Sequence, residues 1–439
     1  MTSIAVFGLG YVGCVTAACF ADLGHDVIGV DVNPDKVAMV EAGQTPVVEE
    51  RIGDLIAATV ESGRLRAATS AVEAVSMTEL ALVCVGTPSA PSGGIFLEHL
   101  ARVAAEIGSA LRERGERYTV AIRSTVLPGT LETLVLPRLE EASGLRAGDD
   151  FGVCSNPEFL REGTSVRDFY EPPKTVVGEF DAASGDAVAR LYEHLPGPLY
   201  RVPIRVAEMT KYVDNAFHAL KVGFANEIGS VCRAFELDSH EVMEIFRADT
   251  KLNISAAYLR PGFAFGGSCL PKDLRALLHA ARHVDVSLPI LDSVLISNET
   301  QIRRVFDLIE ATGARRIGVF GLAFKAGTDD LRESPLVELA ERLVGRGLEV
   351  LIYDDQVAVS RLHGANRAYV EARIPHLSRL MASSADAVAT HGEVCVLGSA
   401  DQAAVDAIAR ATAPVVIDLV RPPGVEVLAS RPGYVGVAW

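Results

Sequence analysis

The sequence has little positive charge. Its 41 Lys and Arg residues are outnumbered by 57 Asp and Glu residues, which gives a formal net charge of −16 and a pI near 5.1. Binding to nucleic acid depends on clustered cations that displace counterions from phosphates, so we expect no nucleic-acid partner. An anionic small ligand would instead be held by a few local cations and by backbone N–H groups.

Signals for export and for membrane insertion are also missing. Residues 4–20 are as apolar as a signal-peptide core, but the first basic residue is Lys36, so the charged segment that precedes such a core is absent. No later stretch reaches the apolar length of a membrane span. We therefore expect a cytoplasmic protein with no membrane partner.

Cysteine is sparse and shows no pattern of metal ligands or disulfides. The seven cysteines are odd in number and lack CxxC or Cys/His spacing, so we expect neither a disulfide framework nor a metal site. Cys14, Cys19, Cys84 and Cys395 lie in apolar runs, where a cysteine is normally a small buried hydrophobe. Cys269 instead follows a glycine-rich run.

Strand-like and helical patterns alternate at both ends of the 439-residue chain, and a long helical stretch over residues 206–237 lies between them. This order predicts an α/β fold with two Rossmann-like, doubly wound parallel-sheet domains joined by a helical central region with a long helix. The expected domains are residues 1–200, 201–312 and 313–439.

A dinucleotide-binding pattern opens the chain. Residues 8–13 read GLGYVG between a strand-like and a helical segment, and Asp31 ends the next strand. The glycines allow a tight turn and close approach to a pyrophosphate, while Asp31 would bind ribose hydroxyls and repel a 2′-phosphate, which favours NAD over NADP. The alternative is a scaffold that has lost its ligand. Thr87 and Thr125 follow later strands, at the sheet edge where ligands bind.

The segment PGFAFGGSCLPKD, residues 261–273, gives Cys269 a reactive setting. Pro271 is typical of the first turn of a helix, which places Cys269 near a helix N-terminus. The helix dipole and Lys272 would both lower the thiol pKa, and Gly266 would let a substrate approach. A buried structural cysteine is the alternative. Beside a hydride acceptor, covalent catalysis on a carbonyl is the better interpretation.

Polar residues form a stripe on the long central helix. Lys211, Asn215, His218 and Asn226 fall within one helical sector, and their types suit a polar pocket better than a solvated face. His218 taken alone is equally well explained as a structural histidine. Glu158 and Glu162 in the segment NPEFLREG have i,i+4 spacing, which would put them on one face if this segment is helical. Such a pair is usually a surface feature, and its position after a strand and beside a turn leaves a role in a pocket as the alternative.

These segments resemble the UDP-glucose/GDP-mannose dehydrogenase family over essentially the whole chain. The resemblance rests on FGLGYVG, CVGTPS, RSTVLPGT, NPEFLRE, VAEMTKY, FANEIG, RPGFAFGGSCLPKD, FKAGTDDLRESPLVELAE and the terminal Trp439. It implies an NAD-dependent, four-electron oxidation of a sugar C6 alcohol to a carboxylate. Cys269 would capture the intermediate aldehyde as a thiohemiacetal, a second hydride transfer would give a thioester, and water would release the uronate.

Matching positions in the family imply residue roles. Lys211 would be a base or an oxyanion stabiliser, Asn215 and Asp273 would organise water and polarise the reacting oxygen, and Glu162 would position the sugar or the hydrolytic water. Cys269 and Thr125 complete the catalytic set. The resemblance implies NAD contacts at Gly8, Gly10, Tyr11, Val12, Gly13, Asp31, Lys36, Thr87, Thr125, Lys272 and Arg332. It implies sugar-nucleotide contacts at Glu162, Lys211, Asn215, His218, Asn226, Tyr258, Arg260, Phe263, Gly266 and Lys325.

The resemblance also implies an assembly and a substrate. The long helix would form the core of a homodimer or of a higher homo-oligomer, and the helical region would supply residues to the partner's site. The similarity is greatest to members that act on GDP-mannose, whose uronate product feeds an alginate-type polysaccharide. One departure is Ala257, where those members carry an aromatic residue.

Three other functions are weighed against this one. A UDP-glucose or UDP-N-acetyl-sugar 6-dehydrogenase would use the same chemistry on a different nucleotide. A single-step 3-hydroxyacid dehydrogenase shares the N-terminal pattern but needs neither Cys269 nor a second α/β domain. An NAD-sensing regulator without catalysis is favoured least, because Cys269, Lys211 and Asp273 are all present.

Overall fold

A computed structural model describes residues 1–88, 90, 94–255, 261–267, 270–323, 331–355, 357, 377–411 and 415–439. The chain divides into two units, Met1–Ala219 and Leu220–Trp439, and helix α9 (Ile204–Ala234) spans the boundary between these ranges. The three expected domains, 1–200, 201–312 and 313–439, stay a prediction. Within the described residues, no helix is long and apolar enough to cross a membrane.

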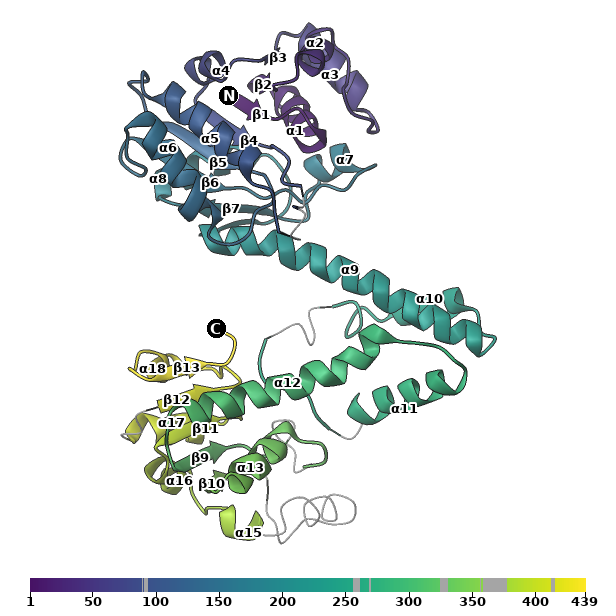
Figure 1. Ribbon diagram of the computed structural model, residues 1–439, viewed down its shortest axis with the longest axis vertical. Coiled ribbons are helices and arrows are strands. Elements are labelled where there is room, and N and C mark those ends of the chain that lie inside the picture. Colours follow the sequence, from purple (N-terminus) through teal and green to yellow (C-terminus); the bar gives the residue numbers. More distant parts are fainter. Residues whose placement is uncertain are drawn as a thin grey trace. The chain divides into compact units, whose positions relative to one another are not determined.

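The first unit is built on an eight-stranded sheet in the order β3-β2-β1-β4-β5-β6-β7-β8 (Figure 1). Neighbouring strands are parallel, except that β7 runs antiparallel to β6. The order 3-2-1-4-5-6 is that of dinucleotide-binding folds. The strands are β1 (Ser3–Phe7), β2 (Asp26–Val30), β3 (Leu65–Ala68), β4 (Leu80–Val83), β5 (Tyr118–Ile122), β6 (Phe151–Ser155), β7 (Thr175–Glu179) and β8 (Leu199–Pro203).

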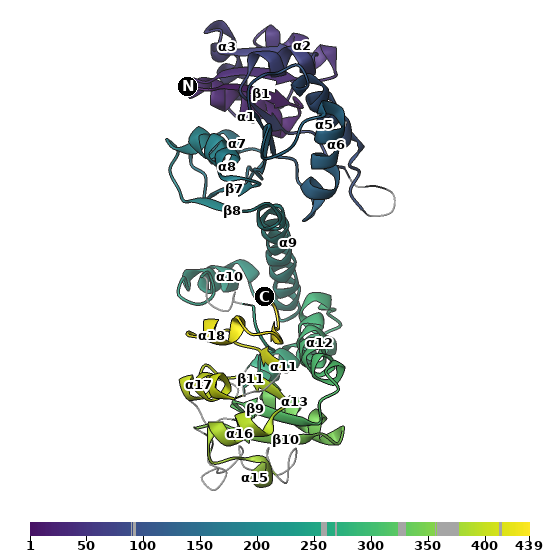
Figure 2. The ribbon, with the colours of Figure 1, turned by 90° about the vertical axis from the view of Figure 1, so that its left-hand side faces the viewer.

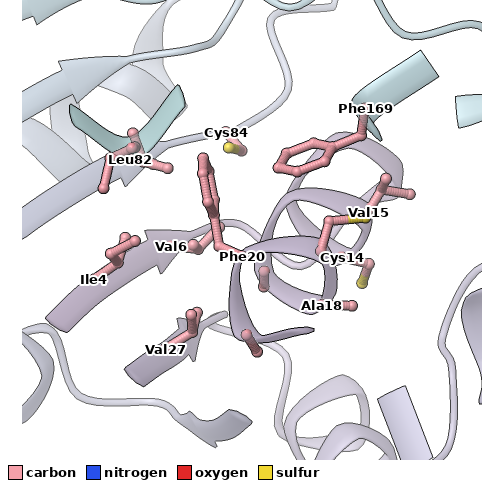
Figure 3. Close-up of a cluster of buried hydrophobic side chains, with 14 of the residues drawn as sticks. Ile4, Val6, Cys14, Val15, Ala18, Phe20, Val27, Leu82, Cys84 and Phe169 are labelled. Atoms are coloured by element: carbon pink, nitrogen blue, oxygen red, sulfur yellow. The ribbon is translucent and has the colours of Figure 1, made fainter. Parts of the chain in front are cut away.

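Helices cover both faces of this sheet because both faces of its central strands are apolar. Along β1, Ile4 and Val6 pack against α1 and α7, while Ala5 and Phe7 face α4, α5 and α6. Figure 3 shows the first cluster, where Phe20 lies beside Phe169. The helical segments are α1 (Tyr11–Asp22), α2 (Pro34–Glu41), α3 (Ile52–Glu61), α4 (Ala71–Met77), α5 (Glu98–Leu111), η1 (Leu131–Val135), α6 (Leu136–Ser143), α7 (Ser165–Tyr170), α8 (Ala182–Ala189) and η2 (Arg190–Tyr192).

The second unit combines helices with a five-stranded parallel sheet in the order β10-β9-β11-β12-β13. Helices α12 and α13 cover one face of it, and α16 and α17 cover the other (Figure 2). The strands are β9 (Arg316–Phe320), β10 (Glu349–Tyr353), β11 (Val394–Leu397), β12 (Val415–Asp418) and β13 (Tyr434–Gly436). The helices are α10 (Ser239–Ala248), α11 (Leu270–His283), α12 (Pro289–Ala311), α13 (Pro335–Gly345), α15 (Leu377–Leu380), α16 (Ala385–His391), α17 (Gln402–Arg410) and α18 (Glu426–Ala429).

Two buried glutamates of α9 hold the starts of other helical segments. Glu208 accepts hydrogen bonds from the backbone N–H groups of Gly129 and Leu131, next to η1. Glu227 does the same for the first turn of α12. These N–H groups have no partner within their own helix, so each carboxylate satisfies two of them at once. Burial still raises the pKa of Glu208.

The expected fold class is confirmed, since two α/β sheets and a long central helix are present. The interpretation of four cysteines as buried hydrophobes is confirmed too. Cys14, Cys19, Cys84 and Cys395 are all less than one-tenth exposed. Burial raises the thiol pKa of Cys84 to about 11 and that of the other three to about 12, so these thiols are inert near neutral pH.

Candidate active site

The glycine turn between β1 and α1 is shaped for a dinucleotide. Gly8 has a φ of +95°, and a Cβ on Gly13 would come within 1.7 Å of the Gly8 carbonyl oxygen, so both positions require glycine. A Cβ on Gly10 would meet nothing within 4 Å, so the backbone there faces open space. Helix α1 begins next to this space and carries no acidic residue in its first turn. Its positive end is therefore free to bind a pyrophosphate.

Asp31 lies beside this turn, as predicted. Its Oδ2 accepts a hydrogen bond of 2.7 Å from the Leu9 N–H, and its Oδ1 accepts one of 2.9 Å from the Asn33 N–H. Lys36 Nζ lies 3.4 Å from Asp31 Oδ2. The carboxylate is thus fixed at the end of β2 with a lone pair left for ribose hydroxyls, and its charge opposes a 2′-phosphate. These residues fit an NAD site.

The turns that follow β4 and β5 are tied together at the same edge of the sheet. Thr87 donates its hydroxyl to the Thr125 carbonyl oxygen at 2.8 Å, and Ser124 donates to the Val85 carbonyl oxygen at 2.6 Å. Strands β4 and β5 are parallel neighbours, and β4 also pairs with β1. The carboxyl ends of these strands therefore bring Thr87 and Thr125 to the edge that carries the glycine turn.

Lys211 of α9 forms a buried ion pair with Glu158 in the segment that follows β6. Its Nζ lies 2.9 Å from Glu158 Oε1, and each of the two side chains is only 10% exposed to solvent. The other oxygen, Glu158 Oε2, accepts a hydrogen bond of 2.6 Å from the Leu160 N–H. A lysine in such surroundings needs a counter-charge, and Glu158 supplies it.

An aromatic ring and a second lysine surround this pair. The Nζ of Lys174 lies 4.6 Å and that of Lys211 lies 5.7 Å from the centre of the Phe159 ring. Lys174 also forms an ion pair of 2.7 Å with Asp214, one helical turn after Lys211. The segment after β6 is thus joined to α9 by the Lys211–Glu158 ion pair and by the contact of Lys211 with Phe159, while Lys174, just before β7, contacts both Phe159 and Asp214 of α9.

In the second unit, side chains of α12 hold the loop that leads to α11. Asn298 exchanges two hydrogen bonds with the backbone of Phe265, at 2.8 Å and 2.9 Å, and Gln301 donates to the Gly262 carbonyl oxygen at 2.7 Å. A Cβ on Gly266 would lie 2.2 Å from the Glu333 carbonyl oxygen, so only glycine fits there. The backbone just before residue 269 is therefore fixed from two sides.

Three family models cover most of the chain. Residues 2–196 match the NAD-binding domain of the UDP-glucose/GDP-mannose dehydrogenase family, residues 205–300 its central domain and residues 318–422 its UDP-binding domain. The chain belongs to this family. The expectations of an NAD cofactor and of a nucleotide-sugar dehydrogenase are thereby confirmed at the level of the family.

Individual members of the family differ in how similar they are to the chain. It is 51% identical to GDP-mannose 6-dehydrogenase of Pseudomonas putida over 399 residues, which cover 91% of each chain. It is 38% identical to a UDP-glucose 6-dehydrogenase of Haloferax volcanii over 359 residues, 80% of this chain and 83% of the other. A crystal structure of a ternary complex of GDP-mannose dehydrogenase from Pseudomonas aeruginosa is 47% identical, with a TM-score of 0.95, and covers 99% of this chain and 100% of its own.

The structure separates several predicted site residues that the spacing in the sequence had grouped together. The segment after β6 is not helical, so Glu158 and Glu162 do not share a helix face. Glu158 pairs with Lys211, whereas Glu162 is exposed in a turn. Asn215 and His218 are exposed, and so is Asn226. Lys211 is thus the buried member of the predicted stripe.

In the second unit, α11 begins at Leu270, so a helix starts close to Pro271 as expected, and Asp273 lies exposed in its first turn. Phe263 is half-buried against the core of the sheet domain, and Arg332 is half-buried as well. Several predicted site residues fall outside the described residues, namely Cys269, Tyr258, Arg260, Lys325, the neighbouring Ala257 and the side chain of Lys272.

Sequence reasoning missed four residues around Lys211. It noted Glu158 without giving it a role, and it gave no role to Phe159, Lys174 or Asp214. The available signal was that a buried lysine needs a counter-charge, which calls for an acidic partner of Lys211. The partner itself lies 53 positions earlier in the chain, so no local pattern connects the two.

Among the residues that the structure describes, no group of three or more His, Cys, Asp or Glu side chains is arranged to hold a metal ion.

Proposed function

We propose that the protein is a GDP-mannose 6-dehydrogenase, which oxidises the C6 hydroxyl of GDP-mannose to the carboxylate of GDP-mannuronate with NAD⁺. The observation that carries the proposal is the buried Lys211–Glu158 pair in a chain with an intact dinucleotide turn. Such a fixed ammonium group stabilises the negative charge that develops on a reacting alkoxide. The choice of GDP-mannose is supported by the higher identity to the enzyme from P. putida, 51%, than to the UDP-glucose enzyme, 38%.

When bound, NAD⁺ supplies the hydride acceptor for each of two successive oxidations at C6. The glycine turn would hold its pyrophosphate, and Asp31 with Lys36 would hold the adenosine ribose. Thr87 and Thr125 would line the nicotinamide end of the site. The full set of proposed cofactor contacts is Gly8, Gly10, Tyr11, Val12, Gly13, Asp31, Lys36, Thr87, Thr125, Lys272 and Arg332.

Cys269, Lys211 and Glu158 would act on the C6 carbon and its oxygen between and after the two oxidations. The Cys269 thiolate would add to the aldehyde carbon, and the oxygen would take a proton, which gives a thiohemiacetal. After the second oxidation, water would attack the thioester, release the thiolate and leave the carboxylate. Lys211 would stabilise the oxygen charge in each step, and Glu158 would hold the ammonium group in place.

Other residues would organise the substrate and the water. Asn215 and Asp273 would orient the hydrolytic water and polarise the reacting oxygen, and Thr125 would assist. Glu162 would position the sugar or the hydrolytic water. The remaining proposed sugar-nucleotide contacts are His218, Asn226, Tyr258, Arg260, Phe263, Gly266 and Lys325.

The assembly and the place of action belong to the same proposal. The exposed apolar side chains of α9 recur every three to four residues and would pack against a second copy of the chain; they include Val206, Met209, Val213, Phe217 and Leu220. We therefore propose a homodimer, in which the helical region serves the partner's site. The enzyme would act in the cytoplasm and supply a uronate precursor for polysaccharide synthesis.

The second candidate substrate is UDP-glucose, favoured by the match of residues 318–422 to a domain described as UDP-binding. The test is NADH formation by the purified protein with GDP-mannose, UDP-glucose and UDP-N-acetylhexosamines, each supplied alone. A preference for GDP-mannose would support the proposal. A preference for a UDP-sugar would keep the chemistry and replace the substrate, and no NADH with any of them would contradict the proposal.

A further inference from the structure

One carboxylate joins the dinucleotide turn to the turn that carries Glu162. Tyr11 is the first residue of α1, and its hydroxyl donates to Glu49 Oε2. The same oxygen accepts the Gly163 N–H at 2.8 Å, and Glu49 Oε1 accepts the Ser165 N–H at 3.3 Å. Glu49 therefore binds three donors from two segments that are about 150 positions apart in the chain.

Tyr11 also contacts the distant turn directly. The Gly163 N–H lies 3.1 Å from the Tyr11 hydroxyl oxygen, and that hydroxyl lies 3.1 Å from Ser165 Oγ. Gly163 follows Glu162 in the chain, so the link reaches the peptide group next to the proposed sugar contact. The turn is therefore attached to the first residue of the helix on which the pyrophosphate would rest.

A second carboxylate holds the same turn without touching Tyr11. Asp168 accepts hydrogen bonds from the Arg161 N–H at 3.1 Å, from the Arg161 guanidinium at 2.6 Å and 2.9 Å, and from the Thr164 hydroxyl at 3.1 Å. This contact lies within residues 161–168. Asp168 thus fixes the shape of the turn, whereas Glu49 fixes its position relative to α1.

We propose that Glu49 is a positioning residue that couples occupancy of the cofactor site to the turn bearing Glu162. Binding of a pyrophosphate at the glycine turn fixes the backbone of Tyr11 at the start of α1. The Tyr11 hydroxyl and Glu49 then fix the Gly163 and Ser165 N–H groups, so the Glu162 turn is ordered before the sugar nucleotide arrives. The sugar part of this inference rests on the proposed function, whereas the link from the cofactor site to the turn does not.

The coupling follows from thermodynamic linkage. If the cofactor orders the turn, a ligand that contacts the turn binds more tightly to the cofactor-loaded protein, and by reciprocity the cofactor binds more tightly when that ligand is present. Tyr11 Oη lies on both the direct route and the route through Glu49, so its removal interrupts the connection, whereas removal of the Glu49 carboxylate leaves the direct contacts of Tyr11 with Gly163 and Ser165. Tyr11→Phe should therefore abolish the coupling and Glu49→Ala should weaken it, and the double variant should show no further loss than Tyr11→Phe.

The first test needs no sugar nucleotide. Hydrogen–deuterium exchange of residues 160–168 is measured with and without saturating NADH in the wild type, Tyr11→Phe, Glu49→Ala and the double variant. Asp168→Asn is the matched control, because it loosens the same turn but keeps the link. NADH binding is measured separately by fluorescence for each protein. We expect NADH to slow exchange about tenfold in the wild type and in Asp168→Asn, to slow it less in Glu49→Ala, and to have no effect in Tyr11→Phe and in the double variant.

The second test extends the coupling to the substrate. The dissociation constant of GDP-mannose is measured calorimetrically with and without NADH. The wild type and Asp168→Asn should bind GDP-mannose about tenfold more tightly with NADH, Glu49→Ala should show a smaller difference, and Tyr11→Phe and the double variant should lose it. If NADH binds to these three variants and slows exchange of residues 160–168 as much as in the wild type, the inference is wrong. If NADH slows exchange as expected but GDP-mannose does not bind to the wild type, the link stands and the proposed substrate is wrong.

Discussion

Lys211 and Glu158 form a buried ion pair, with Lys211 Nζ 2.9 Å from Glu158 Oε1 and one-tenth of each side chain exposed. The ammonium group also lies over the Phe159 ring, and Lys174 approaches that ring as well. Neither charge of the pair has enough water around it to be stable alone, so each depends on the other. The arrangement gives the site a positive charge at a fixed position, which is what a developing alkoxide requires.

Removal of either partner should therefore destabilise the first unit. We expect Glu158→Gln and Lys211→Met each to lower the free energy of unfolding by about 3 kcal/mol, because each leaves one buried charge unpaired. The double variant should lose less than the sum of the two. Urea denaturation measures all three, with Asp26→Asn as a control. Its exposed pair with Arg64 should change stability by less than about 1 kcal/mol. Additive losses in the double variant would contradict the account.

Substitution of Asp31 should change cofactor selectivity. Asp31→Asn removes the charge that opposes a 2′-phosphate and leaves Lys36 without its partner, so NADP⁺ gains an attraction where it met repulsion. We expect the ratio of kcat/KM for NAD⁺ to that for NADP⁺ to fall about tenfold. Asp35→Asn is a matched control on the neighbouring helix, since Asp35 is exposed. Equal changes of this ratio in the two variants would show that Asp31 does not discriminate between a ribose hydroxyl and a 2′-phosphate.

The hydrogen bonds from Asn298 and Gln301 of α12 to the loop before α11 should matter for turnover more than for stability. Asn298→Ala removes both hydrogen bonds to Phe265, and with them the alignment of the backbone that leads to Cys269. We expect kcat to fall about tenfold, because catalysis is sensitive to small displacements of the reacting groups. Gln301→Ala loses a single bond to Gly262 and should have a smaller effect. A similar kcat for Asn298→Ala and the wild type would rule out this role.

Stability at acidic pH should depend on Asp168. The hydrogen bonds from Arg161 lower the pKa of Asp168. A carboxyl with a lower pKa in the folded state stabilises the protein above its unfolded pKa of about 4, and this stabilisation is lost as the pH falls through the folded value. Asp168→Asn should lower the melting temperature at pH 7 by about 2 °C, since the guanidinium is exposed and the pair is weak. The difference from the wild type should vanish as the pH falls below 4. A difference that does not depend on pH would contradict this assignment.

Local patterns in the sequence predicted those features that depend on neighbouring residues. The turn at Gly8 and Gly13 needs glycine for steric reasons, and Asp31 follows at the end of the next strand, so the geometry of this turn and the place of Asp31 beside it could be predicted in detail. The four buried cysteines followed from their apolar neighbours in the same way. In each case the physical requirement is contained within about 20 residues.

Contacts between distant segments could not be predicted. The irregular segment after β6 turns Glu158 toward Lys211 and leaves Glu162 exposed, whereas a helix would have placed both on one face. Its conformation depends on partners in α9, and helical spacing holds no information about them. The contact of Glu49 with Gly163 depends in the same way on the packing of two loops.

The measurement that tests the central proposal most directly is the number of NADH molecules formed per GDP-mannose consumed, with GDP-mannose limiting and the product identified by mass. We expect two NADH and GDP-mannuronate for the wild type, and a Cys269→Ser variant that fails to produce the uronate. One NADH per GDP-mannose with an aldehyde product, or two NADH from the Cys269→Ser variant, would contradict the covalent two-step oxidation.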